Sequence, residues 1–229
     1  MRTRLFVLVM LAAVAVPSLT LAAGPTGIQL QVDGMLTSPA GTLPSAQGAD
    51  LSSLFGSGGG FAVTTSFGIT ARFFGALRVG SFWGSDQRST YQFSDLRPAD
   101  AALLPGSGPF DLDRKLDGIP IHALLQYRRV VSKARIGYYL EAGAGIVSFS
   151  ERMVLWSSAT KLLDIAGYQR EPSYTLGGGL ALPVRGNFDL VAGAHYDGTH
   201  TGDGAVWAKG DNPGFMTGTV GLRYPSVTH

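Results

Sequence analysis

The sequence contains no cysteine, which excludes disulfide bonds and thiolate metal sites. It also lacks an excess of either charge. Two of its 18 basic residues are Arg2 and Arg4, and the other 16 equal the 16 acidic residues in number. After its first four residues the chain is therefore neutral, so the charge balance gives no support for a nucleic-acid partner.

Long apolar runs are scarce as well. The N-terminal run from Leu5 to Val16 is shorter than the roughly 20 residues that a membrane-spanning helix needs. It follows two arginines and precedes Pro17 and the small residues of the segment 20–22. This layout is typical of a secretory signal peptide, which we predict over residues 1–22, with cleavage after Ala22 or Ala23.

Glycine, in contrast, is abundant, with 32 residues in 229, roughly twice the usual share. Glycine is unfavourable in helices but fits strands that curve or approach each other closely. The chain after the signal peptide has the length of one all-β domain. We therefore expect a single β domain over residues 24–225, followed by a short tail at 226–229.

Eight segments alternate apolar and polar residues with a period of two, which predicts strands with two different faces. They cover residues 28–33, 61–69, 77–83, 119–127, 138–146, 174–182, 188–197 and 216–224. Alternation alone is compatible with a soluble sandwich, whose apolar face forms the core. It is equally compatible with a membrane barrel, whose apolar face meets lipid.

The lengths of the connecting segments favour the barrel. Short connectors at about 70–72, 131–134 and 184–187 alternate strictly with long ones at about 38–60, 84–118, 150–172 and 198–213. Outer-membrane barrels have short periplasmic turns and long external loops, whereas a soluble sandwich has no reason to sort its loops in this way.

Aromatic residues gather at both ends of the predicted strands, which indicates two girdles at the membrane interfaces. At the long-loop ends they are Phe61, Trp83, Phe149, Tyr174, Tyr196 and Phe215, and at the short-turn ends Phe73, Tyr127, Tyr138, Phe188 and Tyr224. We expect Trp83, Tyr127, Tyr138, Tyr174, Phe188, Tyr196 and Tyr224 to contact the lipid interface.

Charged residues are sorted too. The long connectors hold most of the acids, whereas the short-turn ends hold the bases Arg72, Arg128, Arg129, Lys133, Arg135, Arg185 and Arg223 and no acid. A charge on a lipid-facing position costs about 2–4 kcal/mol near the midplane. The polar faces are therefore predicted to line the lumen with a cluster of Arg78, Glu141, Asp33, Asp189, Arg223, His122 and His195. Together these patterns predict an eight-stranded antiparallel up-and-down transmembrane β-barrel.

Two neighbouring segments carry a family resemblance. Ile-Pro-Ile-His-Ala-Leu-Leu-Gln-Tyr at 119–127 and Tyr-Tyr-Leu-Glu-Ala-Gly-Ala-Gly-Ile at 138–146 resemble the middle of the outer membrane protein β-barrel domain family, the OmpX-like and OmpA-like small barrels. Val-Gly-Leu-Arg-Tyr at 220–224 is similar to that group's terminal-strand signal. The resemblance implies a bacterial outer-membrane location. It also implies outer-membrane lipids, lipopolysaccharide and the barrel-assembly machinery, which reads the last strand, as partners.

The strand number bears on function, because the side chains of an eight-stranded barrel fill its interior. We predict a lumen plugged by paired polar groups and a structural or surface-interaction role, with an unidentified extracellular ligand at the external loops. The alternative is a small passive ion channel gated by the pair Arg78 and Glu141. Residues 150–172 are apolar for a loop. They leave open whether the segment extends the strands or forms a short capping helix, and whether its apolar side chains form a binding surface or pack against the connector 84–118.

A second alternative is a lipid A-modifying hydrolase. Outer-membrane lipid A deacylases resemble the region of His195 and the segment 212–214, but Asp197 stands at their nucleophile position, so we expect no enzyme. No cofactor or metal is expected either. The glycines at 143, 145, 177 and 179 lack the Lys-Ser/Thr of a phosphate loop, and the acids at 111, 113 and 117 lack EF-hand spacing.

Overall fold

The computed structural model describes residues 27–43, 49–85, 87–91, 110–131, 136–157, 160–184, 187–201 and 211–224. The predicted signal peptide and the C-terminal tail lie outside these residues and stay predictions. None of the helices in the described ranges has the length and apolar character needed to cross a membrane.

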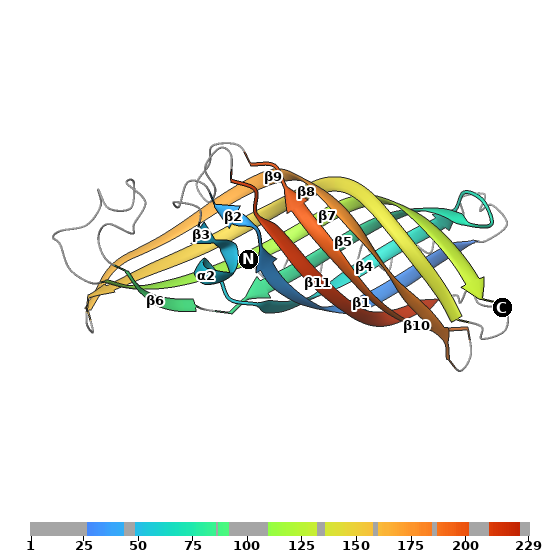
Figure 1. The fold of residues 1–229 in the computed structure, drawn as a ribbon, viewed down its shortest axis with the longest axis horizontal. Helices are drawn as coiled ribbons and strands as arrows, with labels where there is room; N and C mark the ends of the chain where they lie inside the picture. The colour runs from blue at the N-terminus through green and yellow to red at the C-terminus, as the bar shows by residue number, and fades with distance from the viewer. Residues whose placement is uncertain are drawn as a thin grey trace.

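In the described part of the chain, eight antiparallel strands form a closed ring (Figure 1). They are β1 (Ile28–Ala40), β4 (Gly58–Gly68), β5 (Phe73–Gly84), β7 (Phe110–Val131), β8 (Ile136–Ser157), β9 (Thr160–Pro183), β10 (Asp189–Thr199) and β11 (Gly214–Tyr224). Their order is β5-β4-β1-β11-β10-β9-β8-β7, and β7 pairs back onto β5. The predicted eight-stranded antiparallel up-and-down barrel is confirmed.

The first and last strands seal the barrel. β1 pairs with β11 in continuous register from Leu30 opposite Tyr224 to Ala40 opposite Gly214. Closure gives every strand of the ring a neighbour on both sides, which is the condition for placing β-structure in hydrocarbon.

The two faces of the wall differ as the alternation predicts. Large apolar side chains point outward, and Leu36, Leu140 and Val220 are 76%, 60% and 60% exposed. Polar side chains of the intervening positions are buried on the lumen side, among them Gln29, Thr64 and Thr175. Because an apolar outer band is unfavourable in water and favourable in lipid, this surface suits a membrane.

Glycines make room for a large side chain inside the barrel. Tyr139 of β8 is 5% exposed, and a Cβ built on Gly193 of β10 would lie 2.2 Å from its hydroxyl oxygen. A Cβ on Gly179 of β9 would lie 2.8 Å from the Tyr139 ring. These two positions therefore need glycine because the Tyr139 side chain lies across the inner face of the two strands that follow β8 in the wall.

Gly193→Ala is expected to destabilise the barrel by about 1–3 kcal/mol, because the added methyl group overpacks the Tyr139 hydroxyl. Gly218→Ala is the matched control, since a Cβ there meets nothing within 4 Å. Urea unfolding from lipid vesicles measures both variants. Equal unfolding midpoints would show that Tyr139 does not occupy the space above Gly193.

Three strands are longer than the sequence pattern indicates. β7, β8 and β9 have 22, 22 and 24 residues, whereas β10 and β11 have 11 each. Residues 110–118 and most of 150–172, expected to be connecting loop, are therefore strand, and the short strand β6 (Gln87–Tyr91) pairs with β7. The predicted strands were too short because the alternation of apolar and polar residues ends where the lipid ends, whereas hydrogen bonding between neighbouring strands continues beyond that point.

Part of the first long connector also has structure. β2 (Thr42–Leu43) pairs with β3 (Ala49–Asp50), and the helical turn α2 (Leu51–Leu54) follows. Leu51 and Phe55 are 0% and 2% exposed and pack into the barrel mouth. This connector therefore closes one end of the barrel.

Candidate functional site

The centre of the lumen holds a buried ion pair. Arg78 of β5 donates from Nη2 to both carboxylate oxygens of Glu141 of β8, at 2.6 and 2.8 Å. The amide of Gln126 donates to Glu141 Oε2 at 2.9 Å, and Arg78 Nε donates to Thr64 Oγ1 at 3.3 Å. The two charged residues are 63 positions apart in sequence, and their side chains neutralise each other in a buried site.

The remaining predicted lumen residues lie in two neighbouring groups. Arg223 donates to Asp189 Oδ2 at 2.8 Å across the β10–β11 pair, and both are buried. Asp33 accepts two hydrogen bonds from Gln31 Nε2, at 3.0 and 2.9 Å. Each of these carboxylates therefore has a partner on its own or the adjacent strand.

The two lumen histidines meet around one carboxylate. His195 Nε2 lies 3.4 Å from Asp197 Oδ2, and His122 Nδ1 lies 3.9 Å from Asp197 Oδ1. His122 Nε2 is 2.8 Å from Ser173 Oγ. Ser173 and His122 thus lie within hydrogen-bond distance, a contact that sequence reasoning missed because the two residues are distant in sequence, but Asp197 Oδ1 makes no hydrogen bond to His122, so the three residues do not form a catalytic triad.

Access also limits the chemistry open to these residues. The cavity beside His122, His195 and Asp197 has a volume of about 20 Å³. Such a space holds about one water molecule and excludes an acyl or peptide substrate. Among the described residues, no group of three or more His, Asp or Glu side chains could hold a metal ion.

An apolar plug closes the extracellular end of the lumen. Phe215 stacks at 5.2 Å from Phe82 and 5.7 Å from Phe149, measured between ring centroids. We define the apolar plug as the buried cluster Met35, Leu51, Phe55, Ala62, Phe82, Leu116, Val147, Phe149 and Phe215.

The plug corrects one prediction. Phe149 and Phe215, expected in the outer aromatic girdle, are 0% and 3% exposed and point inward. The parity of each strand indicated this inward position, because Phe149 lies on the same face of its strand as Glu141, and Phe215 lies on the same face as Thr217.

Arg128 lies at a short-turn end, as expected. Its side chain is 7% exposed and is buried at the periplasmic end of the lumen, a position that the sequence analysis did not assign to it. It donates to Ser66 Oγ at 2.9 Å and to the side-chain oxygens of Gln29 and Gln126. Arg128 has the parity of Gln126, so the alternation of its strand indicated this position.

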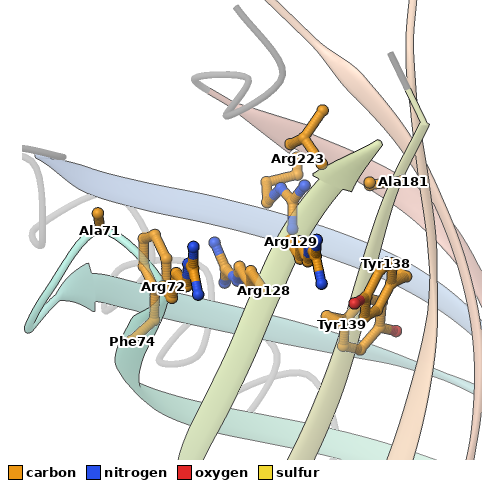
Figure 2. Close-up of a pocket in the computed structure, with 11 residues that line it drawn as sticks. Ala71, Arg72, Phe74, Arg128, Arg129, Tyr138, Tyr139, Ala181 and Arg223 are labelled. Atoms are coloured by element: carbon orange, nitrogen blue, oxygen red, sulfur yellow. The ribbon is translucent and has the colours of Figure 1, made fainter. Parts of the chain in front are cut away.

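Arg128 borders a larger cavity at the periplasmic end, with a volume of about 320 Å³ (Figure 2). Arg72, Arg129 and Arg223 line it together with aromatic residues of β5 and β8. We call this space the arginine vestibule. The lumen therefore carries paired charges at its centre, an apolar plug at one end and a basic cavity at the other.

No protein-family model matches the chain, and no curated protein sequence matches it. Solved structures do match. Neisserial surface protein A is 16% identical over 88% of this chain and 99% of its own, with a TM-score of 0.51. A major outer membrane protein from Thermus thermophilus is 13% identical over 86% and 99%, also at 0.51. The chain has the fold of the bacterial outer-membrane β-barrels.

The outer-membrane barrel carries aromatic pairs on its outer surface near each end. Trp83 lies 6.4 Å from Phe61, and Tyr174 lies 6.2 Å from Tyr196, at the extracellular side. At the periplasmic side the pairs are Phe73–Tyr127, Tyr127–Tyr138 and Phe188–Tyr224, at 5.5, 6.5 and 5.0 Å. All seven aromatics expected at the lipid interface are thus partly or fully exposed on the wall.

Beyond the extracellular side, the outer-membrane barrel continues as what we call the external sheet (Figure 1). It consists of β6 with residues 110–118 of β7, 150–157 of β8 and 160–172 of β9. One side holds the apolar cluster Leu112, Met153 and Leu155, against which Leu162, Leu163 and Ile165 pack. Of the two structures left open for 150–172, strand extension is therefore the one observed, and the contact with Leu112 is packing against the connector 84–118.

The other side of the external sheet is polar. Arg152 donates to both oxygens of Asp164, at 3.1 and 2.9 Å, and Lys161 also donates to Asp164. These hydrogen bonds, first from Arg152 and then from Lys161, hold the pKa of Asp164 below its usual value. Trp156 donates from Nε1 to Asp113 at 2.8 Å.

Proposed function

We propose that this outer-membrane barrel is a non-conducting surface protein that binds an extracellular protein through the external sheet. The observation that carries the proposal is the edge of β9. Residues 160–168 of β9 pair with β8, whereas pairing of β9 with β10 begins only at Ser173, so no strand of the described ranges covers the other edge of this segment. An exposed strand edge can accept a further strand, which supports a protein partner.

The closed lumen supports the non-conducting part of the proposal. Ions would have to pass the apolar plug and then separate the pair Arg78–Glu141. Two cavities beside the ion pair and the apolar plug have volumes of only about 20 and 10 Å³. The passive-channel alternative therefore requires both the apolar plug and the Arg78–Glu141 pair to rearrange.

The position of His195 does not support the lipid A deacylase alternative. His195 is 5% exposed and faces the lumen, whereas a lipid substrate would approach from the outside of the wall. Tyr196, its neighbour in β10, takes the outward position instead.

A hairpin truncation tests the surface role. Glu151 lies opposite Gly167 in the β8–β9 register, so an Asn-Gly turn joining them removes residues 152–166 and leaves the barrel intact. Whole cells carrying wild-type protein should adhere to at least one member of a panel of immobilised matrix and serum proteins. Cells carrying the truncated variant should lose that adherence, and Thr90→Ala in β6 should retain it.

The same variant separates a surface role from a structural one. A barrel that only stabilises the envelope needs its wall but not its external sheet, so truncation would leave detergent resistance of the cells unchanged. Equal adherence of truncated and wild-type cells, with detergent sensitivity appearing only when the whole barrel is deleted, would replace our proposal by the structural role.

Planar-bilayer recording tests the closed lumen. We expect no reproducible discrete openings from the wild-type protein. Openings that disappear in Arg78→Ala or Glu141→Ala would show that the charged pair lines a conducting path and would restore the channel alternative.

A further inference from the structure

The arginine vestibule is a built cavity that the surface role does not use. It lies at the turn end of the barrel, opposite the external sheet, and its volume of about 320 Å³ far exceeds that of the lumen cavities. Figure 2 shows Arg72, Arg128, Arg129 and Arg223 around it, together with Phe74 and Tyr138. These residues come from the turn before β5 and from β5, β7, β8 and β11.

The vestibule carries more positive charge than the described residues neutralise. Arg223 pairs with Asp189. For Arg72, Arg128 and Arg129, no carboxylate lies within ion-pair distance among the described residues. Three like charges facing one cavity repel each other, so a bound anion would lower the electrostatic energy of the site.

Arg128 is held firmly in place although its partners are neutral. Its guanidinium lies 4.1 Å above the Phe74 ring and donates to Ser66 and to the side-chain oxygens of Gln29 and Gln126. Its backbone N–H donates to the Arg72 carbonyl at 2.8 Å, which keeps these two residues adjacent. A buried charge without an opposite charge is costly, and this one is oriented before any ligand arrives.

Arg223 provides a second indication of a missing ligand. It is 2% exposed and lines the vestibule, yet its Nε–H has no hydrogen-bond partner within the described part of the chain. Buried donors in proteins are nearly always satisfied, and an orphaned one next to a cavity indicates a ligand or an ordered water.

We propose that the arginine vestibule binds a phosphate group. Guanidinium groups form paired, charge-assisted hydrogen bonds with phosphate oxygens, and a phosphate supplies several acceptors and more than one negative charge to the cluster. The group can belong to a phospholipid head at the inner leaflet or to a soluble periplasmic phosphate. The site lies at the opposite end of the molecule from the external sheet, so it does not depend on the surface role.

Pyrophosphate is the soluble probe. In zwitterionic detergent it should raise the thermal unfolding midpoint of the wild-type protein saturably, beyond the effect of sodium chloride at equal ionic strength. The double variant Arg72→Gln/Arg129→Gln changes two exposed cavity residues and should weaken pyrophosphate binding about 10-fold or more. The matched control Arg152→Gln/Arg170→Gln removes two exposed arginines of the external sheet and should bind as the wild type does.

Phosphatidylglycerol is the lipid probe. Native mass spectrometry of barrels from mixed phosphatidylglycerol and phosphatidylcholine nanodiscs should show retained phosphatidylglycerol on the wild type and its loss from Arg72→Gln/Arg129→Gln. Retention without pyrophosphate binding assigns the phosphate to a lipid head, and pyrophosphate binding without retention assigns it to a soluble ligand.

The proposal fails if neither probe binds saturably, or if Arg152→Gln/Arg170→Gln weakens binding as much as the vestibule variant does. The second result would indicate a general effect of surface charge. Faster gel migration of unheated than of boiled protein verifies that every variant has folded. Arg128→Gln then serves as a second test wherever it passes this check.

Discussion

Glu141→Gln is expected to lower the free energy of unfolding by about 3–5 kcal/mol. The variant keeps the shape of the side chain but leaves the Arg78 guanidinium without its opposite charge in a buried site. Urea unfolding from lipid vesicles measures the loss. Asp164→Asn, which breaks an exposed ion pair of the external sheet, should leave the barrel midpoint unchanged.

A double replacement distinguishes the charge from the contact. Arg78→Met/Glu141→Leu removes both charges together and should recover most of the stability lost in Glu141→Gln, because no unpaired charge remains. A Glu141→Gln midpoint equal to that of the wild type would mean that water reaches Arg78 and that the lumen is not closed at this level.

Phe149→Ala should cost about 3–5 kcal/mol, because it opens a cavity at the centre of the apolar plug. Phe149 is 0% exposed and its ring lies 5.7 Å from that of Phe215. Tyr168→Ala is the matched control on the external sheet, where the side chain is 60% exposed, and it should unfold near the wild-type midpoint.

Planar-bilayer recording adds a second measurement on Phe149→Ala. The variant should remain silent, because the Arg78–Glu141 layer stays intact beneath the enlarged space. Discrete openings in Phe149→Ala alone would identify the plug, and not the ion pair, as the barrier to ions. A loss below about 1 kcal/mol would contradict the close packing of Phe149.

Phe149, Phe215 and Arg128 show that strand parity predicts the position of a side chain better than residue type near the strand end does. Phe149 and Phe215 were assigned to the girdle because they stand near strand ends, although their parity placed them inside. Arg128 was grouped with the other bases of the short-turn ends and left out of the lumen cluster, although its parity placed it inside. In each case strand parity was the more reliable signal. Backbone geometry fixes the direction of each side chain in a strand, whereas the gathering of aromatic or basic residues at strand ends is only a statistical preference.

Alternation along the chain was sufficient to predict the strands, their two faces and their number, because side-chain orientation in a strand is a local property with a period of two. Connector lengths, aromatic ends and charge sorting, which can also be read from the sequence, added the membrane barrel and its direction. Residues such as Arg78, Glu141 and Asp189 could therefore be assigned to the lumen without coordinates. Only the tertiary structure decided which of them meet. Ring closure and strand register bring Arg78 to Glu141 and Ser173 to His122, and they place Leu51 in the mouth, Arg128 beside Arg72 and the β9 edge outside the membrane. These are contacts between distant segments, and no periodicity within a single segment encodes them.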